Sequence, residues 1–262
     1  MNQLGGDVLI ISKIEKPKAI ENLDKIIDLS DGILVARGDL GVEMKLEKVP
    51  LLQKQMIKSC NEKGKIVITA TQMLESMIEH PVPTRAEVSD VANAVYDGTD
   101  ALMLSAETAS GNYPVETVRQ MRAIAHEVEL TRRFTGMDVG SGSKNIAGVV
   151  SSSAVHAAES IMAKAIVCHT ESGRTAWMIS KYHPTVPLIA FTPNMRAYYR
   201  MSLFYGVKAI LVKQYPSTEK MVAAGDSLLL EAKVCKRGDK VVIVAGEVQI
   251  KGATNMIKIH AL

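Results

Sequence analysis

Residues 32–39 read GILVARGD, a short aliphatic run that passes directly into charged and glycine residues. The run is almost continuously apolar instead of alternating with polar residues, which is typical of a strand covered on both faces. Similar runs occur at residues 8–11, 66–70 and 101–105. We therefore expect strands of one sheet at residues 8–11, 32–36, 66–70 and 101–105, each followed by polar residues.

Amphipathic stretches separate these runs and are predicted to be helices, at residues 18–29, 50–62, 87–96 and 115–130. Strands that alternate with helices indicate parallel pairing with right-handed crossovers. A second series follows, with strands expected at residues 165–168, 187–191, 207–212, 240–245 and 255–260. Its helices are expected at residues 147–163, 173–180, 195–201 and 217–233. Both halves of the chain are therefore predicted to be α/β.

A linker separates the two series. Residues 131–145, TRRFTGMDVGSGSKN, contain three glycines and two serines and have no apolar periodicity. We expect a first domain at residues 1–130, a linker at residues 131–146 and a smaller α/β domain at residues 147–262. A length of 262 residues fits two domains of ordinary size.

Composition excludes several classes of protein. With 47% hydrophobic and 23% charged residues, the chain is predicted to fold and is not of the disordered class. The net charge of +3 is small and its charges are interspersed, which argues against nucleic acid or a membrane surface as a partner. No apolar stretch is long enough to span a membrane, and the first residues do not have the pattern of a signal peptide. Three cysteines without C-x-x-C spacing favour a reduced, cytoplasmic setting.

Polar clusters follow all four predicted strands of the first domain. They are SKIE at residues 12–15, RGD at residues 37–39, TQ at residues 71–72 and SAET at residues 105–108. The carboxyl ends of parallel strands meet at one edge of a sheet, where α/β proteins bind their ligands. We therefore expect the candidate site at this edge.

The first two clusters suggest a metal site. Lys13 and Glu15 are two residues apart and leave an extended backbone on the same side, while Asp39 follows the adjacent strand. Two carboxylates beside one ammonium suit Mg²⁺ or Mn²⁺, with the remaining ligands supplied by water and a phosphorylated substrate. An ion pair that merely closes the strand end is an equally acceptable interpretation of Lys13 and Glu15. The histidines and cysteines do not have the spacing of a zinc site.

Backbone and hydroxyl groups add to the predicted site. Arg37, Gly38 and Asp39 combine a sharp turn with a helix start, whose N–H groups suit a carboxylate or phosphate. Thr71 would present a hydroxyl at the same edge, although a lone threonine is more often a helix cap.

A separate pattern marks the start of a helix. Thr84 and Glu87 have the spacing of a capping box, with Thr84 as N-cap. That structural role is sufficient for both residues, whereas Arg85 could also serve the site or a subunit contact.

Taken in order, these segments resemble pyruvate kinase. The matching segments are IISKIE at residues 10–15, DGILVARGDLGVE at residues 31–43, ITATQMLESM at residues 68–77 and PTRAEVSDVANAV at residues 83–95. CHTESGRTAWMISKYHP at residues 168–184 and GATNMIKIH at residues 252–260 resemble the C-terminal regulatory domain of that family. The resemblance implies a partial (β/α) barrel of about four βα units, the second half of a TIM barrel, followed by the regulatory domain. The first four barrel strands and the lid domain are expected to be absent from this chain.

The resemblance also implies an activity, the glycolytic transfer of a phosphoryl group from phosphoenolpyruvate to ADP, which yields pyruvate and ATP. By position, Lys13 would stabilise the transferring phosphoryl group, and Glu15 and Asp39 would bind Mg²⁺ or Mn²⁺. Arg37, Gly38 and Asp39 would bind the substrate, and Thr71 would lie near the carbon that is protonated. The family also implies K⁺, whose site is expected outside this chain, and a cytoplasmic homotetramer.

The second half carries a candidate phosphate site. Its residues are Thr170, Glu171, Ser172, Gly173, Arg174 and Thr175, which join a predicted strand to a predicted helix. Hydroxyls, a glycine and an arginine at a helix start suit a phosphate, although an ordinary capped turn has the same composition. The resemblance implies an allosteric sugar phosphate here, with the identity of the effector set by residues 245–252, which include Lys251.

Three hypotheses follow. The first is a phosphotransferase that binds phosphoenolpyruvate and Mg²⁺, although activity of this chain alone is doubtful. The second is a non-catalytic regulatory protein that binds a sugar phosphate, and the third is a structural fragment that associates through open strand edges. The joint presence of Lys13, Glu15, Asp39 and Thr71 favours the first.

Overall fold

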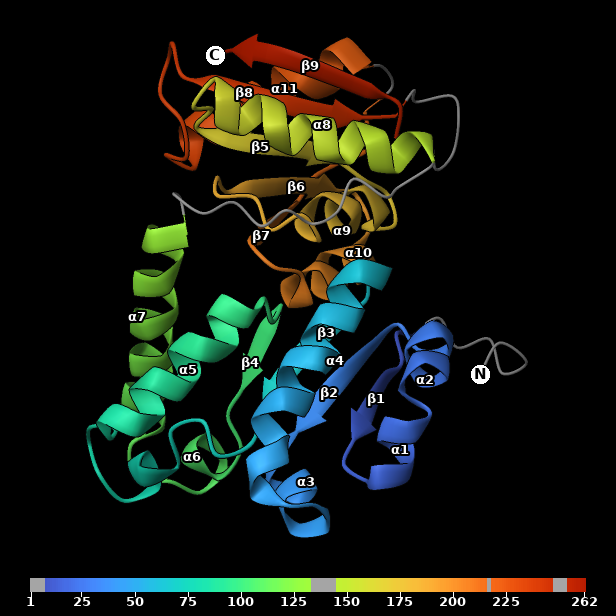
Figure 1. Cartoon of the computed structure of the whole chain (residues 1–262). Helices are drawn as coiled ribbons and strands as arrows, with labels where there is room; N and C mark the ends of the chain where they lie inside the picture. Colours follow the sequence, from blue (N-terminus) through green and yellow to red (C-terminus); the bar gives the residue numbers. More distant parts are fainter. Residues whose placement is uncertain (1–7, 133–144, 216–217, 247–253) are drawn as a thin grey trace. The chain divides into compact units, whose positions relative to one another are not determined.

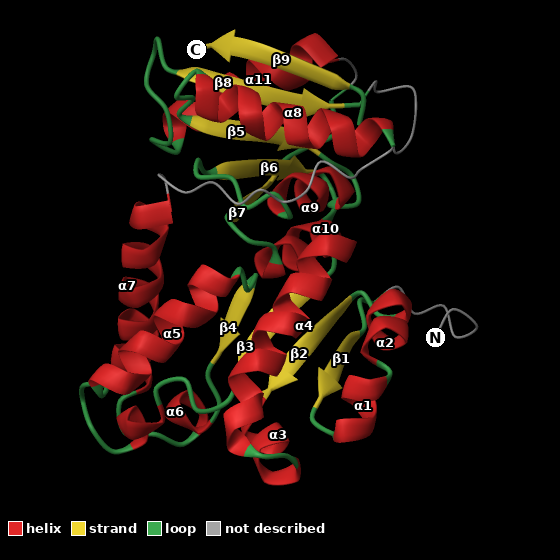
Figure 2. Ribbon diagram, in the orientation of Figure 1, coloured by secondary structure: helices red, strands yellow, loops and turns green. Residues whose placement is uncertain are grey.

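The computed structural model describes residues 8–132, 145–215, 218–246 and 254–262. The chain splits into two compact units, Met1–Gly136 and Met137–Leu262. Each unit contains its own sheet, as Figures 1 and 2 show. Most of the predicted linker, residues 133–144, lies outside the described residues. No helix in the described ranges combines the length and the apolar character needed to cross a membrane.

A four-stranded parallel sheet forms the centre of the first unit, in the order β1-β2-β3-β4, so the prediction of parallel strands is confirmed. The strands are β1 Ile11–Ile14, β2 Gly32–Ala36, β3 Ile66–Ala70 and β4 Ala101–Met103. The helices are α1 Pro17–Glu21, α2 Leu23–Leu29, α3 Arg37–Glu43, α4 Val49–Lys63, α5 Arg85–Asp97, α6 Ala106–Ala109 and α7 Pro114–Arg132, with short 3₁₀ turns η2 Leu46–Lys48 and η3 Glu75–Ile78. In Figure 2 the strand arrowheads point toward α3 and α6, which lie at the carboxyl edge of the sheet.

Helices cover one face of this sheet. Ile33 and Val35 of β2 and Val67 of β3 are buried in a core with residues of α2 and α4. The other face carries Leu34 and Ile68, which are partly exposed. The helices of the described unit therefore fully bury only one face of the sheet, whereas strands of such apolar composition are typically covered on both faces.

The first strand begins later than the sequence predicts, at Ile11 instead of residue 8. Pairing with β2 starts at Gly32, and the Ile10 carbonyl accepts hydrogen bonds from the backbone N–H groups of Asp31 and Gly32. Val8 lies before this pairing and is 60% exposed. Apolar composition thus located the segment, but the neighbouring strand sets its start. As a result, Lys13 lies within β1.

The second unit has a five-stranded sheet in the order β7-β6-β5-β8-β9, in which only β9 is antiparallel to its neighbour. Its strands are β5 Ala165–His169, β6 Leu188–Thr192, β7 Val207–Leu211, β8 Lys240–Ala245 and β9 Met256–Ala261. Its helices are α8 Ile146–Ser160, α9 Arg174–Ser180, α10 Met195–Arg200 and α11 Thr218–Glu231, with the 3₁₀ turn η4 Met201–Leu203.

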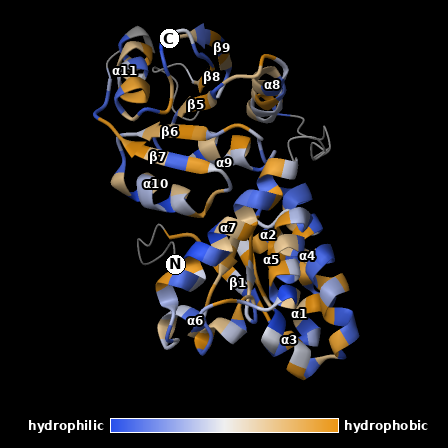
Figure 3. Ribbon diagram, turned by 90° about the vertical axis from the view of Figure 1, so that its left-hand side faces the viewer, coloured by the Kyte–Doolittle hydropathy of each residue, from blue (hydrophilic) through white to orange (hydrophobic). Residues whose placement is uncertain are grey.

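Helices cover both faces of this second sheet, because two separate cores lie against it. One contains Ile166 of β5 with residues of α8 and α9, and the other contains Val167 of β5 with residues of α11. All five residues of β6 are buried, and Figure 3 shows this strand in hydrophobic colours. The second unit is therefore a three-layer α/β structure.

Gly32 allows β2 and β3 to approach closely, because an added Cβ would lie 2.5 Å from the Ile66 carbonyl oxygen. We expect Gly32→Ala to lower the free energy of unfolding of the first unit by about 1–3 kcal/mol. Gly41→Ala is the matched control, since its Cβ would meet only the tip of the exposed Leu46 side chain. Urea unfolding followed by circular dichroism measures both changes, while fluorescence of the single tryptophan, Trp177, reports on the second unit. An unchanged midpoint for Gly32→Ala would contradict the prediction.

Candidate functional site

The predicted site residues of the first unit lie at the carboxyl edge of its sheet. Lys13 is the third residue of β1, and Glu15 follows that strand directly. Asp39 lies in the first turn of α3, which begins immediately after β2, and Thr71 follows β3. The parallel pairing of β1 with β2, and of β2 with β3, brings these three segments side by side.

Lys13 is the centre of a cluster of three charges. Its Nζ lies 2.6 Å from Glu15 Oε2 and 2.8 Å from Asp39 Oδ2. The side chains of Lys13, Glu15 and Asp39 are 51%, 37% and 48% exposed, so the cluster is open to solvent. The structure thus brings both carboxylates to one ammonium, and their role in metal binding stays a prediction.

The hydrogen bonds of this cluster perturb its titration. The bond to Asp39, and then the bond to Glu15, raise the pKa of Lys13 well above its ordinary value despite partial desolvation. The same contact with Lys13 lowers the pKa of Asp39 below its ordinary value. Lys13 and Asp39 are therefore both charged over the whole neutral pH range.

Thr71 and Gln72 form an unusual turn after β3. Their φ angles are 66° and 54°, in the left-handed region that residues other than glycine rarely adopt. Such a conformation costs of the order of 1–3 kcal/mol per residue and persists only where the surroundings hold it. Thr71 Oγ1 accepts a 2.7 Å hydrogen bond from the Gly38 N–H and donates to the Ala70 carbonyl at 2.7 Å.

Arg37, predicted to bind substrate, is buried beneath this turn with 9% of its surface exposed. Its Nη2 donates to the Thr71 carbonyl at 2.7 Å and the Gln72 carbonyl at 3.1 Å. Its Nη1 lies 2.5 Å from Asp90 Oδ2 and donates to Gln53 Oε1 at 3.4 Å. The structure directs the Arg37 guanidinium at protein groups, and its contact with substrate stays a prediction.

Two residues at this edge were assigned no role from the sequence. Glu107 is 2% exposed, and its carboxylate accepts hydrogen bonds from the N–H of Ser105 at 2.6 Å and of Leu74 at 3.4 Å. It thereby joins the loops that follow β3 and β4. The cluster SAET contained Glu107, but no spacing in the sequence indicated its partner. Asp90 lies in the middle of α5, where nothing in the sequence connected it with Arg37.

The predicted capping box of α5 is confirmed. The Glu87 N–H donates to Thr84 Oγ1 at 3.3 Å, and the Thr84 N–H donates to Glu87 Oε2 at 2.7 Å. Glu87 also accepts hydrogen bonds from the Ser76 N–H and hydroxyl. Burial raises the pKa of Glu87, but the hydrogen bonds from Ser76 and Thr84 outweigh it and lower that pKa overall. The start of α5 is therefore joined to the segment after β3.

The predicted phosphate loop of the second unit lies between β5 and α9. Thr170 Oγ1 accepts from the Gly173 N–H at 3.0 Å, and the Thr175 hydroxyl is 2.8 Å from that of Thr254. Thr170 and Thr175 are buried, whereas Glu171, Ser172 and Arg174 are exposed. Gly173 has a φ of 86°, which suits glycine at this turn. Most of the predicted effector loop, including Lys251, lies outside the described residues.

A metal at the first site would have few protein ligands. Among the residues that the structure describes, no three His, Cys, Asp or Glu side chains are grouped to hold a metal ion. The carboxylates of Glu15 and Asp39 form a pair of hard oxygen donors, converging within 2.8 Å of one nitrogen. This donor set fits Mg²⁺ or Mn²⁺ with additional ligands from water and substrate.

Comparisons with known proteins agree along the whole chain. Residues 1–118 match the family model described as pyruvate kinase, barrel domain, and residues 148–260 match that described as pyruvate kinase, alpha/beta domain. The pyruvate kinase of Clostridium acetobutylicum is 45% identical over 267 aligned residues, covering 100% of this chain and 56% of the relative. That of Bacillus licheniformis is 47% identical over 259 residues, covering 98% and 44%. That of Dictyostelium discoideum is 43% identical over 268 residues, covering 99% and 53%. The chain spans about half the length of the curated relatives it matches.

We expect Asp39→Asn to lower the pKa of Lys13, because Asp39 provides the largest contribution that raises it. As the pH rises, the Lys13 ammonium of the Asp39→Asn variant should begin to lose its proton at a lower pH than the Lys13 ammonium of the native chain. Carbon NMR of ¹³C-labelled lysine, with the Lys13 signal identified by Lys13→Arg, follows this titration. Glu43→Gln is the control, since Glu43 pairs with Lys16 at 3.5 Å. Identical Lys13 titration in native and Asp39→Asn chains would contradict the assigned interaction.

Proposed function

Since this chain belongs to the pyruvate kinase family, we propose that it takes part in transfer of the phosphoryl group of phosphoenolpyruvate to ADP. In that reaction the bond from phosphorus to the enol oxygen breaks, and a bond from phosphorus to an ADP oxygen forms. The enolate carbon then takes a proton, which gives pyruvate. Phosphoryl transfer depends on positioning and on neutralisation of charge more than on covalent chemistry by the protein.

The charge cluster carries this proposal. Exposed ion pairs contribute only about 0–1 kcal/mol to stability, so folding gives little reason to gather Lys13, Glu15 and Asp39 at one strand edge. Lys13 would contact the transferring phosphoryl oxygens and neutralise their charge. Glu15 and Asp39 would hold the divalent cation. When bound, Mg²⁺ supplies further neutralisation of the phosphoryl oxygens.

The neighbouring groups suit the carboxylate and the enol carbon of the substrate. The N–H groups of Gly38 and Asp39 lie at the start of α3, where an anion is stabilised. The Gly38 N–H donates to Thr71 Oγ1 at 2.7 Å, so a substrate carboxylate that accepts from this N–H would replace that hydrogen bond and lie next to the Thr71 hydroxyl. Thr71 would thereby be close to the carbon that is protonated. Arg37 stays a proposed substrate-binding residue, although the donors of its side chain point at protein groups.

For the second unit, we propose a regulatory phosphate site formed by Ser172 and Arg174. β5 has β6 on one side and β8 on the other, so the order of the strands reverses at β5, and ligands commonly bind at such a point. Ser172 and Arg174 are exposed there, while Thr170 and Thr175 shape the loop. A sugar phosphate is the proposed effector.

The remaining partners follow from the family. ADP and ATP are the proposed nucleotide substrates. Mg²⁺ or Mn²⁺ is the proposed divalent cation, and K⁺ is the proposed monovalent cation. We assign no residue of this chain to the nucleotide or to K⁺. A homotetramer in the cytoplasm is the proposed state. The three cysteines, all buried and unpaired, are consistent with a reducing compartment.

The first test is binding of phosphoenolpyruvate to the chain with and without Mg²⁺, measured by calorimetry. We expect Mg²⁺-dependent binding in the native chain and a loss of roughly tenfold or more, about 1.4 kcal/mol, in Glu15→Gln, because the variant lacks one anionic ligand. Glu43→Gln removes a nearby carboxylate outside the cluster and should bind like the native chain. Equal affinity of the native chain and Glu15→Gln would contradict the assigned metal site.

The protonation step can be tested without a nucleotide. Protonation of the enol carbon and its reverse share one transition state, so the chain with Mg²⁺ should exchange the methyl hydrogens of pyruvate with D₂O. Thr71→Val should slow this exchange, measured by proton NMR, by at least about tenfold. Thr71→Ser keeps the hydroxyl and should retain most of the rate. Exchange at the native rate in Thr71→Val would argue against a role for the hydroxyl.

A further inference from the structure

The turn that carries Thr71 needs an external support. Two consecutive residues with side chains, Thr71 and Gln72, adopt left-handed backbone angles that their own preferences oppose. We propose that the Arg37–Asp90 ion pair positions Thr71, by holding this turn so that the Thr71 hydroxyl meets the Gly38 N–H. This inference rests on the proposed function, since it gives that site a positioning pair.

Three successive carbonyl groups of the turn converge on Arg37. Nε lies 3.3 Å from the Ala70 carbonyl oxygen, and Nη2 lies 2.7 Å and 3.1 Å from those of Thr71 and Gln72. In an extended chain, successive carbonyl groups alternate in direction and cannot meet one guanidinium, whereas a helical turn of either hand points them the same way. The planar donor fork of arginine therefore suits a helical turn, which the left-handed angles of Thr71 and Gln72 form here.

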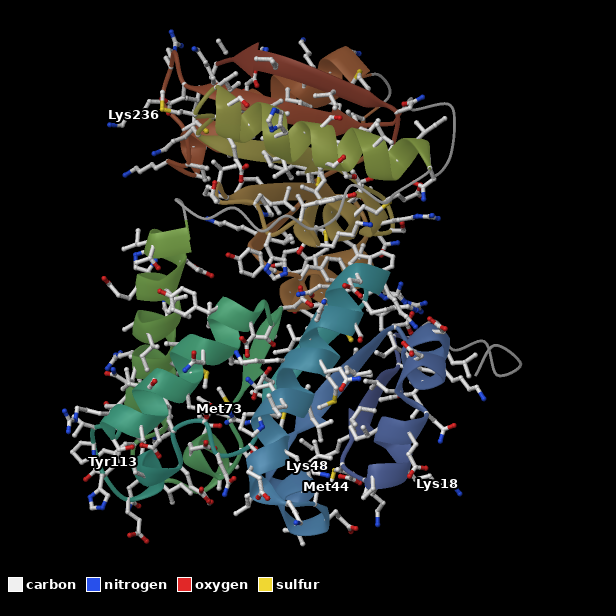
Figure 4. The ribbon with its side chains drawn as sticks, in the orientation of Figure 1. Lys18, Met44, Lys48, Met73, Tyr113 and Lys236 are labelled. Atoms are coloured by element: carbon white, nitrogen blue, oxygen red, sulfur yellow. The ribbon has the colours of Figure 1, made fainter. Side chains whose placement is uncertain are left out.

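Asp90 is what keeps the fork in place. A buried guanidinium without a counter-ion is strongly unfavourable, and Asp90 Oδ2 lies 2.5 Å from Arg37 Nη1. The buried Gln53 of α4 supports the same nitrogen at 3.4 Å and contacts Asp97, at the end of α5, at 3.2 Å. The guanidinium is thus anchored to two helices that cover the sheet. Figure 4 labels Met73, whose sulfur accepts from Nη2 of Arg37 at 2.8 Å just beyond the turn.

Arg37 acts on both partners of the Thr71–Gly38 hydrogen bond. Through its side chain it holds the Thr71 backbone, and through the peptide bond it directly precedes Gly38. A change in the guanidinium position therefore alters the 2.7 Å contact from both sides. Asp90, on α5, acts on this contact through Arg37.

Hydrogen exchange of the Gly38 amide tests this positioning in the full chain without substrate. The chain is labelled with ¹⁵N-glycine, and the Gly38 signal is identified by its loss in Gly38→Ala, whose Cβ would make an ordinary 3.5 Å contact with Thr71. Asp90→Ala should accelerate exchange at Gly38 about tenfold or more, as should Arg37→Lys, whose point charge cannot form the fork. Asp90→Glu keeps the carboxylate and should restore much of the protection.

The Gly98 amide, which bonds to the Val95 carbonyl at 3.1 Å, is the internal reference for the stability of the unit. Acceleration confined to Gly38 supports the proposal. Equal acceleration at Gly38 and Gly98, or native exchange at Gly38 in a folded Asp90→Ala chain, overturns it. If Arg37→Lys does not fold, the two Asp90 variants decide, because they leave the Arg37 side chain itself unchanged.

Binding of phosphoenolpyruvate with Mg²⁺ separates this inference from the proposed function. Asp90→Ala should weaken that binding at least about threefold, whereas Ile57→Val, a core change away from the turn, should leave it unchanged. Weaker protection at Gly38 with native affinity in Asp90→Ala would overturn a positioning role. Absence of binding by the native chain would instead count against the proposed function. The exchange result at Gly38 does not depend on substrate, so it would still decide whether Asp90 and Arg37 hold the turn.

Discussion

The parallel register of β1, β2 and β3 is the constraint on which the candidate site depends. Pairing of Lys13 with Leu34 and of Ala36 with Ala70 sets where each strand ends, and thus which side chains share the carboxyl edge. A shift of one residue would turn Lys13 to the helix-covered face and separate it from Asp39. The close passage at Gly32 maintains this register from within the sheet.

Two kinds of interaction meet at this edge and differ in their cost to the fold. The cluster around Lys13 is solvated, so its charges would rearrange at little free-energy cost if a cation or phosphate bound there. The Arg37 guanidinium is buried, and loss of its partner Asp90 leaves that charge without compensation. The exposed groups are therefore suited to bind and release ligands, while the buried group keeps the backbone in place.

The sequence predicted the segments better than the contacts. Continuous apolar runs located β2 and β3 residue for residue, because four of the five residues in each strand are buried. The start of β1 was misplaced, since it depends on hydrogen bonds to Asp31 and Gly32 that composition does not contain. The approach of Glu15 and Asp39 to Lys13 followed from strand geometry. The partnership of Arg37 with Asp90 joins residues 53 positions apart on different helices and has no local signal.

The left-handed backbone at Thr71 implies a conflict between the stability of the fold and the presence of a hydroxyl group at this position. Glycine adopts such angles without steric cost, so a chain selected for thermal stability alone would favour glycine at this position. Glycine would also remove the hydroxyl that contacts Gly38. Design that raises the melting temperature by scoring the backbone conformation would therefore favour replacement of this residue. Threonine at this position therefore opposes the preference of the backbone and supplies the hydroxyl that contacts Gly38.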